Sequence, residues 1–301
     1  TMNRRVVVGD VGGTHARWAV YDGILGPVSV QQTRETTSLE ESLERYLADH
    51  TFEPDAVCVG VAGPVVDGRA ALTNVEWMAS EEKVRWPTKL LNDLEAVAYA
   101  VPVLKTMDLT ALHGSAAAGN YLVVGVGTGF GGALVQDGQV HAMEPGHDPL
   151  EAFDVESEAL IAQLKAVVDI PTIEDVVSGR GLELILQMKK LGVEGVPAGR
   201  VVSEGWRQCD ELAWVRRNFL RCFGFSLGRL IQRNHALGGV FVAGGVVGHW
   251  LDDLSSELFL SSYSASVASM NGDVEPPIQV IKHPHAALLG AGIMGQGLFA
   301  Q

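Results

Sequence analysis

The order of apolar and polar positions alternates between strand-like and helix-like segments along the whole chain. Short, largely apolar runs predict strands that are buried on both faces, at residues 6–8, 57–61, 121–126 and 240–243, and a further strand at residues 278–281. Buried strands that alternate with helical segments indicate a mixed α/β protein.

The segments between these strands have the 3.6-residue apolar spacing of amphipathic helices. Ser38 and Glu41 form a capping box, which predicts the start of one helix. Further helices are predicted at residues 94–100, 157–168, 181–191, 204–237 and 286–299, with Gly192 ending the third of these.

Glycines gather at the ends of the apolar runs and reveal a weak internal repeat. One unit has a strand, a Gly/Thr loop at residues 9–14, a second strand and an Asp-Gly turn at residues 22–23. The same unit recurs at residues 121–138, with its loop at residues 127–132. Asp-Gly favours hairpins, because both central residues of a type I′ turn take positive φ. The repeat suggests two related halves that meet near residues 102–112.

Composition limits the classes of protein and of partner. The length of 301 residues allows one large domain or two ordinary ones, and a net charge of −14 argues against nucleic acid and anionic membranes as partners. Cys58, Cys209 and Cys222 form no CxxC pair, which excludes a Cys-rich zinc site and a disulfide framework. No apolar run is long enough to span a membrane and no signal peptide is recognisable, so we expect a soluble cytoplasmic protein.

The two Gly/Thr loops are candidate phosphate-binding loops. A tight glycine turn lets backbone N–H groups approach an anion, and a Thr hydroxyl adds a donor. Because the protein is acidic, backbone dipoles and Mg²⁺ must hold the phosphate in place of a basic patch. We assign Asp10 to Mg²⁺, directly or through water, since a carboxylate beside a phosphate is repulsive without a cation between them. Either loop alone would be an ordinary hairpin turn, but the matching pair favours phosphate binding.

Other nucleotide-binding motifs do not fit these loops. Neither loop reads G-x-x-x-x-G-K-[ST], and neither is followed by a helix as the dinucleotide-binding fingerprint requires. Gly244 and Gly245, which follow the strand at residues 240–243, fit a third nucleotide contact and a plain strand-to-helix turn equally well.

Five short motifs occur in a characteristic order. They are Gly9-Asp10-Val11-Gly12-Gly13-Thr14, Leu91-Asn92-Asp93, Gly127-Thr128-Gly129, Glu144-x-x-His147 and Phe241-Val242-Ala243-Gly244-Gly245. This order resembles the bacterial glucokinases of the hexokinase, Hsp70 and actin superfamily, over about residues 6–292. The first motif marks only the superfamily, whereas its combination with Asn-Asp and Glu-x-x-His is much more specific.

The resemblance implies a two-domain α/β, actin-like ATPase (ribonuclease H-like) fold with a deep interdomain cleft. It implies a small domain at residues 2–103 with a C-terminal helix at residues 286–301, and a large domain at residues 104–285. The implied activity is phosphorylation of glucose at its 6-hydroxyl, the first step of glycolysis, with ATP and Mg²⁺ as cofactors. ATP would contact residues 9–14, 127–129 and 244–245. A homodimer is left open.

Asp93 is the candidate catalytic base. It follows the apolar run at residues 89–91 and precedes a helix, so we expect it at a strand end or a helix N-terminus. The residues alone favour a helix N-cap, whereas the resemblance favours the base, and one residue can serve both roles. A carboxylate is a weak base, which suffices if the proton moves late in a loose transition state.

The resemblance also implies a set of sugar ligands. Asn92, Glu144, His147 and Glu174 supply the fixed donors and acceptors that pair with sugar hydroxyls. For Glu174 an exposed helix carboxylate is almost equally favoured. Residues 73–74 match a family segment near the sugar more weakly.

Two positions depart from the family pattern. The family's Glu-Gly-Gly-His carries Pro145 as its second residue here; proline fixes φ and removes an N–H, which leaves the preferred hexose open. His15 replaces the usual Asn after the first Thr. We expect His283 and His285 to be surface or structural residues.

Two alternatives remain beside glucose phosphorylation, and a third, an ATPase chaperone module, is disfavoured because no peptide-binding domain follows the nucleotide core in this sequence. A kinase for mannose or an amino sugar fits the altered loop, and a non-catalytic sugar-sensing protein fits the same fold. A metal site at Glu144 and His147, with His141 and Asp148 near them in sequence, ranks below a sugar contact because no second His or Cys pair completes a shell.

Overall fold

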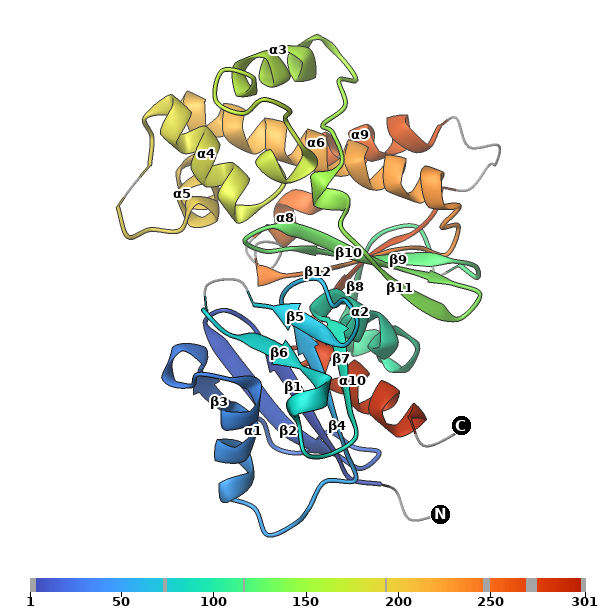
Figure 1. The fold of residues 1–301 in the computed structure, drawn as a ribbon. Helices are drawn as coiled ribbons and strands as arrows, with labels where there is room; N and C mark the ends of the chain where they lie inside the picture. The colour runs from blue at the N-terminus through green and yellow to red at the C-terminus, as the bar shows by residue number, and fades with distance from the viewer. Residues whose placement is uncertain are drawn as a thin grey trace. The chain divides into compact units, whose positions relative to one another are not determined.

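The computed structural model describes residues 4–72, 75–115, 117–192, 194–245, 250–268 and 275–298. The described chain divides into two compact units (Figure 1). The first unit contains the residues up to Lys105 and those from His283 onward, and the second runs from Thr106 to Lys282.

The first unit is built on a five-stranded sheet in the order β3-β2-β1-β4-β7. Its strands are β1 (Val6–Val11), β2 (His15–Tyr21), β3 (Ser29–Gln32), β4 (Ala56–Val61) and β7 (Thr88–Asn92). Strands β4 and β7 run parallel to β1, whereas β2 and β3 form antiparallel ladders. Val11 pairs with Val61 and Val61 with Asn92, so the C-terminal ends of the three parallel strands share one edge of the sheet.

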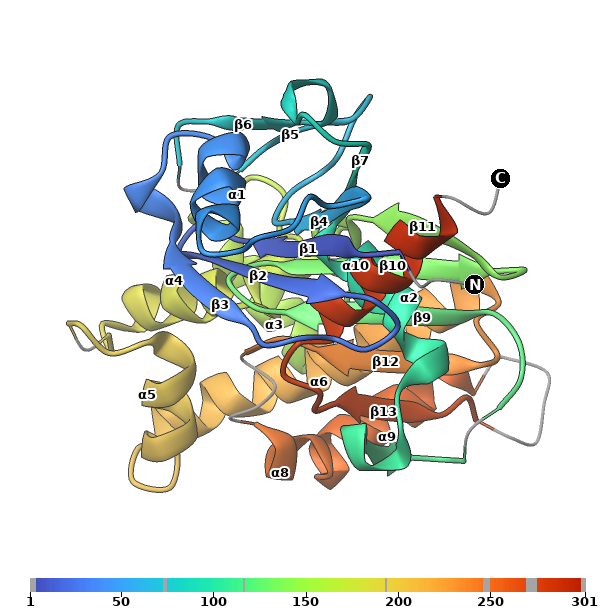
Figure 2. The same cartoon turned by 90° about the horizontal axis from the view of Figure 1, so that it is seen from below.

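Helices cover this sheet, and one of them comes from the C-terminal part of the chain. The helices are α1 (Leu39–Ala48), α2 (Asp93–Ala100) and α10 (Ala286–Gly297). The unit also contains the 3₁₀ turns η1 (Thr33–Glu35), η2 (Glu81–Lys83) and η3 (Val101–Val103). Strands β5 (Arg69–Ala71) and β6 (Met78–Ser80) form a small antiparallel ladder. Helix α10 packs against α2, β1 and β4 (Figure 2). Val7, Trp18 and Leu43 form part of one buried cluster, and Val8, Leu91 and Leu288 part of a second.

The second unit is built on a six-stranded sheet in the order β11-β10-β9-β12-β13-β8. Its strands are β8 (Leu109–His113), β9 (Tyr121–Val126), β10 (Phe130–Gln136), β11 (Gln139–Met143), β12 (Gly239–Ala243) and β13 (Ile278–Ile281). Strands β9, β12 and β13 are parallel neighbours. Ala243 pairs with Gly125, so the segments that follow β9 and β12 leave from the same edge.

The remaining helices belong to the second unit. They are α3 (Val155–Leu164), α4 (Gly179–Lys189), α5 (Ala198–Gly205), α6 (Asp210–Asn234), α8 (Leu251–Leu254) and α9 (Glu257–Val267), with the 3₁₀ turns η4 (Thr106–Asp108), η5 (Pro145–His147) and η6 (Ile173–Asp175). Helix α6 packs along α9 through the small residues Gly224 and Gly228; a Cβ at Gly228 would overlap Ser266 Oγ at 1.6 Å. None of the helices in the described ranges is both long and apolar enough to cross a membrane.

The predicted mixed α/β pattern is confirmed, and the capping-box helix begins where it was expected. Ser38 Oγ accepts from the Glu41 N–H at 3.1 Å, and the Thr37 N–H donates to the Glu41 carboxylate at 2.7 Å. The predicted helix at residues 204–237 is confirmed over α6, residues 210–234, but its start is wrong, because α5 ends at Gly205 and α6 begins only at Asp210.

One of the two Asp-Gly turns agrees with its sequence pattern, whereas the other turn and the end of one helix differ. Asp137 and Gly138 both have positive φ, 51° and 78°, as a type I′ hairpin requires. At the first Asp-Gly only Gly23 has positive φ, and β3 begins only at residue 29, so that pair is not a two-residue hairpin. Helix α4 ends at Lys189 with a left-handed Lys190, not at Gly192.

Candidate functional site

The first candidate phosphate loop is a tight turn between β1 and β2. Its Gly12 N–H donates to the His15 carbonyl at 2.9 Å, while the N–H groups of Gly13 and Thr14 have no partner in the described part of the chain. Thr33 supports the turn from outside, since its hydroxyl donates to the Gly12 carbonyl at 2.7 Å and its N–H to the Thr14 carbonyl at 3.0 Å. The turn therefore leaves two backbone donors for an anion.

The loop is shorter than the sequence predicted, because residues 9–11 belong to strand β1. A Cβ at Gly9 would lie 2.7 Å from the Trp18 ring and 2.9 Å from Val59, so core packing explains this glycine. Val11 is fully buried, and its carbonyl accepts from Ala62 N–H at 3.1 Å. The prediction of one continuous loop at residues 9–14 is therefore wrong, and the turn itself is residues 12–14.

Asp10 lies at the end of β1 and pairs with an arginine that the sequence analysis did not single out. Arg17 Nη1 lies 3.3 Å from Asp10 Oδ2, across the β1–β2 ladder. Burial raises the pKa of Asp10, although the positive charge of Arg17 acts in the opposite direction. A carboxylate is a ligand that Mg²⁺ prefers, and Mg²⁺ usually completes its shell with waters and phosphate oxygens. The described residues contain no cluster of three or more His, Cys, Asp or Glu side chains that could hold a metal, so a bound Mg²⁺ would depend on those extra ligands.

His285 contributes a further polar group near Asp10. It immediately precedes α10, and its buried Nδ1 has no hydrogen-bond partner in the described ranges. Burial, His283 and Arg17 all lower the pKa of His285. We expected His285 to be a surface or structural residue. The sequence did not predict that it lies near the Asp10–Arg17 pair.

Asn92 and Asp93 occupy the junction of β7 and α2, as predicted for Asp93. Asn92, not Asp93, is the N-cap: its Oδ1 accepts from the N–H groups of Leu94 and Glu95 at 3.0 and 3.4 Å. The Glu95 carboxylate accepts from the Asn92 N–H at 3.1 Å and completes a capping box. Asn92 is 6% exposed, and its Nδ2 donates to the Gly63 carbonyl at 3.1 Å.

Asp93 is the first residue of α2 and is half-buried. Its Oδ1 accepts from the Leu94 N–H at 2.9 Å. A Cβ at Gly60 would lie 3.7 Å from Asp93 Cα and 3.8 Å from the Gly9 carbonyl oxygen, so Asp93 lies where β1 and β4 approach α2. Asp10 and Asp93 therefore come from the same edge of the sheet as the turn at residues 12–14. Residues 73–74, also predicted near the sugar, lie outside the described residues.

The second candidate phosphate loop is residues 127–129, because β10 begins at residue 130. Gly127 N–H donates to the Gly129 carbonyl at 3.0 Å. The start of α4 fixes the loop, since the N–H groups of Gly179 and Arg180 donate to the carbonyls of Gly127 and Thr128 at 2.8 and 3.0 Å. The N–H groups of Thr128 and Gly129 have no partner among the described residues, so this turn also leaves two donors for an anion.

Gly244 and Gly245 lie at the same strand edge as this second loop. Gly244 has a φ of 106°, and a Cβ there would lie 2.4 Å from the Val126 carbonyl oxygen. Only glycine fits both the backbone conformation and this approach to β9. A Cβ at Gly245 would meet nothing within 4 Å among the described residues, which leaves room beside this glycine.

Glu174 is held against the second loop from three sides. Its Oε2 accepts from the Phe130 N–H at 3.4 Å, and its Oε1 lies 3.1 Å from Arg180 Nη2 and 3.8 Å from His147 Nδ1. The side chain is only 17% exposed, so the alternative of an exposed helix carboxylate is wrong. Tertiary contacts thus bring two predicted sugar ligands, Glu174 and His147, together.

Backbone hydrogen bonds join the loop that carries His147 to the segment that leads into Glu174. Asp148 O accepts from Ile173 N–H at 3.0 Å, and Leu150 N–H donates to Pro171 O at 2.9 Å. In the first of these loops, Glu144 and His147 are both exposed. Pro145 is buried, and a Cβ at Gly132 would lie 3.2 Å from its Cγ, so the proline fills space beside β10.

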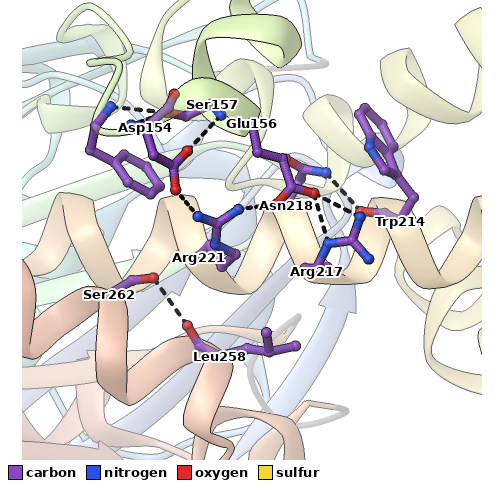
Figure 3. A network of polar contacts seen from close by, with 10 residues as sticks. Asp154, Glu156, Ser157, Trp214, Arg217, Asn218, Arg221, Leu258 and Ser262 are labelled. Carbon is purple, nitrogen blue, oxygen red and sulfur yellow. Dashed lines mark hydrogen bonds and ion pairs between the residues drawn. The ribbon is translucent and has the colours of Figure 1, made fainter.

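Ion pairs connect the segment after this loop to helix α6. Figure 3 shows the side chains of Asp154 and Glu156 directed toward Arg221, with Glu156 also reaching Arg217. The distance from Arg217 Nε to Glu156 Oε1 is 2.7 Å. Nearer the loop, Arg233 Nη1 lies 3.3 Å from Asp148 Oδ2. A line of α6 arginines therefore fixes the chain between the loop at residues 144–148 and α3.

Known proteins of one family match the chain along nearly its whole length. A protein-family model described as Glucokinase matches residues 7–297. The glucokinase of Caulobacter vibrioides (strain NA1000 / CB15N) is 32% identical over 312 residues, which cover 95% of this chain and 94% of that protein.

Two solved structures share the fold. A crystal structure of a glucokinase from an Antarctic psychrotroph has a TM-score of 0.82 and 24% identity, covering 97% of this chain and 99% of that chain. A ROK family glucokinase from Streptomyces griseus, in complex with glucose and AMPPNP, has a TM-score of 0.63 and 20% identity over 97% of this chain and 99% of that chain. These likenesses confirm the predicted fold class, the α/β fold of the actin-like ATPases.

Proposed function

We propose roles for individual residues in this chain, which belongs to the glucokinase family. The chain is an ATP-dependent hexose kinase that converts glucose to glucose 6-phosphate. One observation supports these residue roles above all. Asp93 and the turn at residues 12–14 both follow strands that end at the same edge of the sheet in the first unit.

In our proposal the glycine turns hold the phosphates of ATP. Among the described residues, the turns at 12–14 and 127–129 each offer two N–H groups without a hydrogen-bond partner, and a Cβ at Gly245 would meet nothing within 4 Å. The Streptomyces griseus relative binds glucose and AMPPNP, and we extend both kinds of ligand to this chain. Asp10 would hold Mg²⁺, directly or through water. When bound, the ion neutralises charge on the phosphate oxygens.

We assign the proton transfer to Asp93. The oxygen of the glucose 6-hydroxyl attacks the γ-phosphorus, its proton passes to an Asp93 carboxylate oxygen, and the bond to the β,γ-bridging oxygen breaks as ADP leaves with the electron pair. Because the transition state is loose, the carboxylate acts late and mainly orients the hydroxyl. The hydrogen bond from the Leu94 N–H to Oδ1 fixes the carboxylate for this task.

Four side chains are proposed to hold the sugar. Asn92 keeps a second amide N–H beyond its bond to Gly63, and this donor would meet a sugar hydroxyl. Glu144, His147 and Glu174 would supply the remaining acceptors and donors. Burial and the three contacts of Glu174 support a fixed acceptor, which is what discrimination between hydroxyl patterns requires.

The acidic chain and its unpaired thiols support the remaining proposals. With a net charge of −14 we propose neither a nucleic-acid nor a membrane partner. All three cysteines are free, which fits the cytoplasm. Sedimentation would test the homodimer that the sequence leaves open.

A hexose panel with MgATP tests the proposed function. ADP release is coupled to an optical signal, and glucose should give the highest kcat/KM among glucose, mannose and amino sugars. A higher value for another hexose would indicate that Pro145 has redirected specificity. Absence of turnover with every hexose, while glucose still raises the melting temperature, would favour the sugar-sensing alternative.

A further inference from the structure

Arg180 contacts both the second phosphate loop and a proposed sugar ligand. Its backbone N–H donates to the Thr128 carbonyl at 3.0 Å, which fixes the residue to the loop. Its side chain turns back, and Nη2 lies 3.1 Å from Glu174 Oε1. One residue at the start of α4 therefore joins the loop to the carboxylate.

The glycine at position 129 makes this arrangement possible. A Cβ there would lie 3.0 Å from Glu174 Oε2 and 3.4 Å from Arg180 Nη2. The charged pair thus occupies the space directly beside the loop where any other residue would project its side chain. The absence of a side chain lets the guanidinium lie against the backbone that would hold phosphate.

The guanidinium has capacity for another anion. A guanidinium carries five N–H donors, and Arg180 uses one nitrogen for Glu174 among the described residues. The side chain is 59% exposed, so the other donors are accessible. Arginine is suited to phosphate, because its planar fork forms paired, charge-assisted hydrogen bonds.

We propose that Arg180 is a phosphate-binding residue that neutralises the polyphosphate of ATP at the residue 127–129 loop while it holds Glu174 in position. The inference rests on the proposed function, because it takes that loop as a phosphate site and Glu174 as a sugar ligand. The proposal adds a positively charged side chain to a phosphate site for which the sequence predicted backbone N–H groups as donors. It also predicts that nucleotide and sugar affinities depend on one shared side chain.

Calorimetric titration of Arg180→Gln with AMPPNP and with ADP, both with Mg²⁺, tests the proposal directly. We expect dissociation constants about tenfold higher than for the unmodified chain, the usual size for loss of a charge-assisted hydrogen bond. Added salt should weaken nucleotide binding more in the unmodified chain than in Arg180→Gln, because screening acts on the charge that the variant lacks. Arg180→Lys keeps the charge without the fork and should give an intermediate value.

Arg200→Gln is the matched control. Arg200 is 60% exposed, lies in the second unit and pairs with Glu204 at 2.8 Å, so its loss removes the same charge and a similar ion pair. We expect no change in AMPPNP affinity. Gly129→Ala, which keeps Arg180 but crowds the pair, should also weaken AMPPNP binding.

Two outcomes would overturn the proposal. Unchanged AMPPNP and ADP affinities in Arg180→Gln would exclude a phosphate contact. A higher KM for glucose with unchanged nucleotide affinity would restrict Arg180 to positioning Glu174. Because nucleotide binding is measured without sugar, a failure of the hexose panel would leave this comparison interpretable on its own.

Discussion

Asp148 and Arg233 form an ion pair, with 3.3 Å between Oδ2 and Nη1, that connects the proposed sugar loop to helix α6. Asp148 directly follows His147, and its carbonyl accepts from Ile173, the residue before Glu174. One residue therefore fixes the loop that carries His147 to the turn that carries Glu174, and its side chain anchors both to α6.

Asp148→Asn should raise the KM for glucose about three- to tenfold with little change in kcat, because the loop loses an anchor but no reacting group. Stability should fall by less than about 1 kcal/mol, since the pair is partly exposed. Steady-state kinetics with glucose as the varied substrate would measure the split.

The control for this prediction is Arg45→Gln. Arg45 and Arg233 have equal side-chain exposure, 44%, and Arg45 pairs with Glu35 at 3.4 Å in the first unit. Its loss should leave the KM for glucose unchanged. If Asp148→Asn behaves like this control, the ion pair has no role in positioning the loop.

Asp93→Asn should lower kcat by about a thousandfold, within the range for loss of a general base, while glucose binding survives. Ser38→Ala removes the N-cap of α1, so it should cost about 1 kcal/mol of stability without loss of activity. This comparison separates the loss of a base from disturbance of a helix N-terminus. Near-normal turnover in Asp93→Asn would refute the assignment, and glucose-induced thermal shifts would report binding.

The sequence predicted the place of Asp93 but not the role of its neighbour. An apolar run followed by a helical pattern locates the junction to within a residue, which is why Asp93 was expected there. Asn and Asp are nearly equal N-caps, so local chemistry alone does not tell which of the two adjacent residues caps the helix. The capping box with Glu95 decides for Asn92 and leaves Asp93 as the first helical residue.

Long-range pairs were the part of the site that the sequence could not give. Glu174 meets Phe130, 44 positions away, and Arg17 meets Asp10 across a hairpin, yet no local pattern marks either contact. The break between α5 and α6 was missed for a related reason. Apolar positions keep helical spacing across it, so the spacing does not mark the break; α5 packs closely on α6 there, since a Cβ at Gly205 would lie 2.6 Å from Leu212.

Asp154 should make folding stability depend on pH at the acid end. Burial opposes its ionisation, but hydrogen bonds from Ser157 and the charge of Arg221 outweigh burial and lower the pKa of Asp154 below its ordinary value. A lowered folded pKa stabilises the fold above the unfolded pKa of about 3.9, and the contribution is lost as pH falls through the folded value.

Asp154→Ala should therefore cost about 1 kcal/mol at pH 7, mainly as the lost N-cap of α3. The difference in stability from the unmodified chain should shrink as pH falls from 5 toward about 2. Urea unfolding at several pH values measures it. A difference that stays constant over this range would show that the carboxylate charge is not involved.

Gly290→Ala should destabilise the first unit strongly. Gly290 lies in α10, and a Cβ there would overlap the Ala96 carbonyl oxygen of α2 at 1.7 Å, so the two helices must move apart. Overpacking of this kind typically costs about 1–3 kcal/mol. Because α2 begins with Asp93, the displacement should also lower kcat. Gly297→Ala provides the control in the same helix, since a Cβ there meets no described atom within 4 Å and alanine at this last helical residue favours the helix by at most about 1 kcal/mol. Denaturant midpoints and kcat of both variants test the prediction, and equal stability of the two would mean that α10 does not pack on α2 as closely as this structure has it.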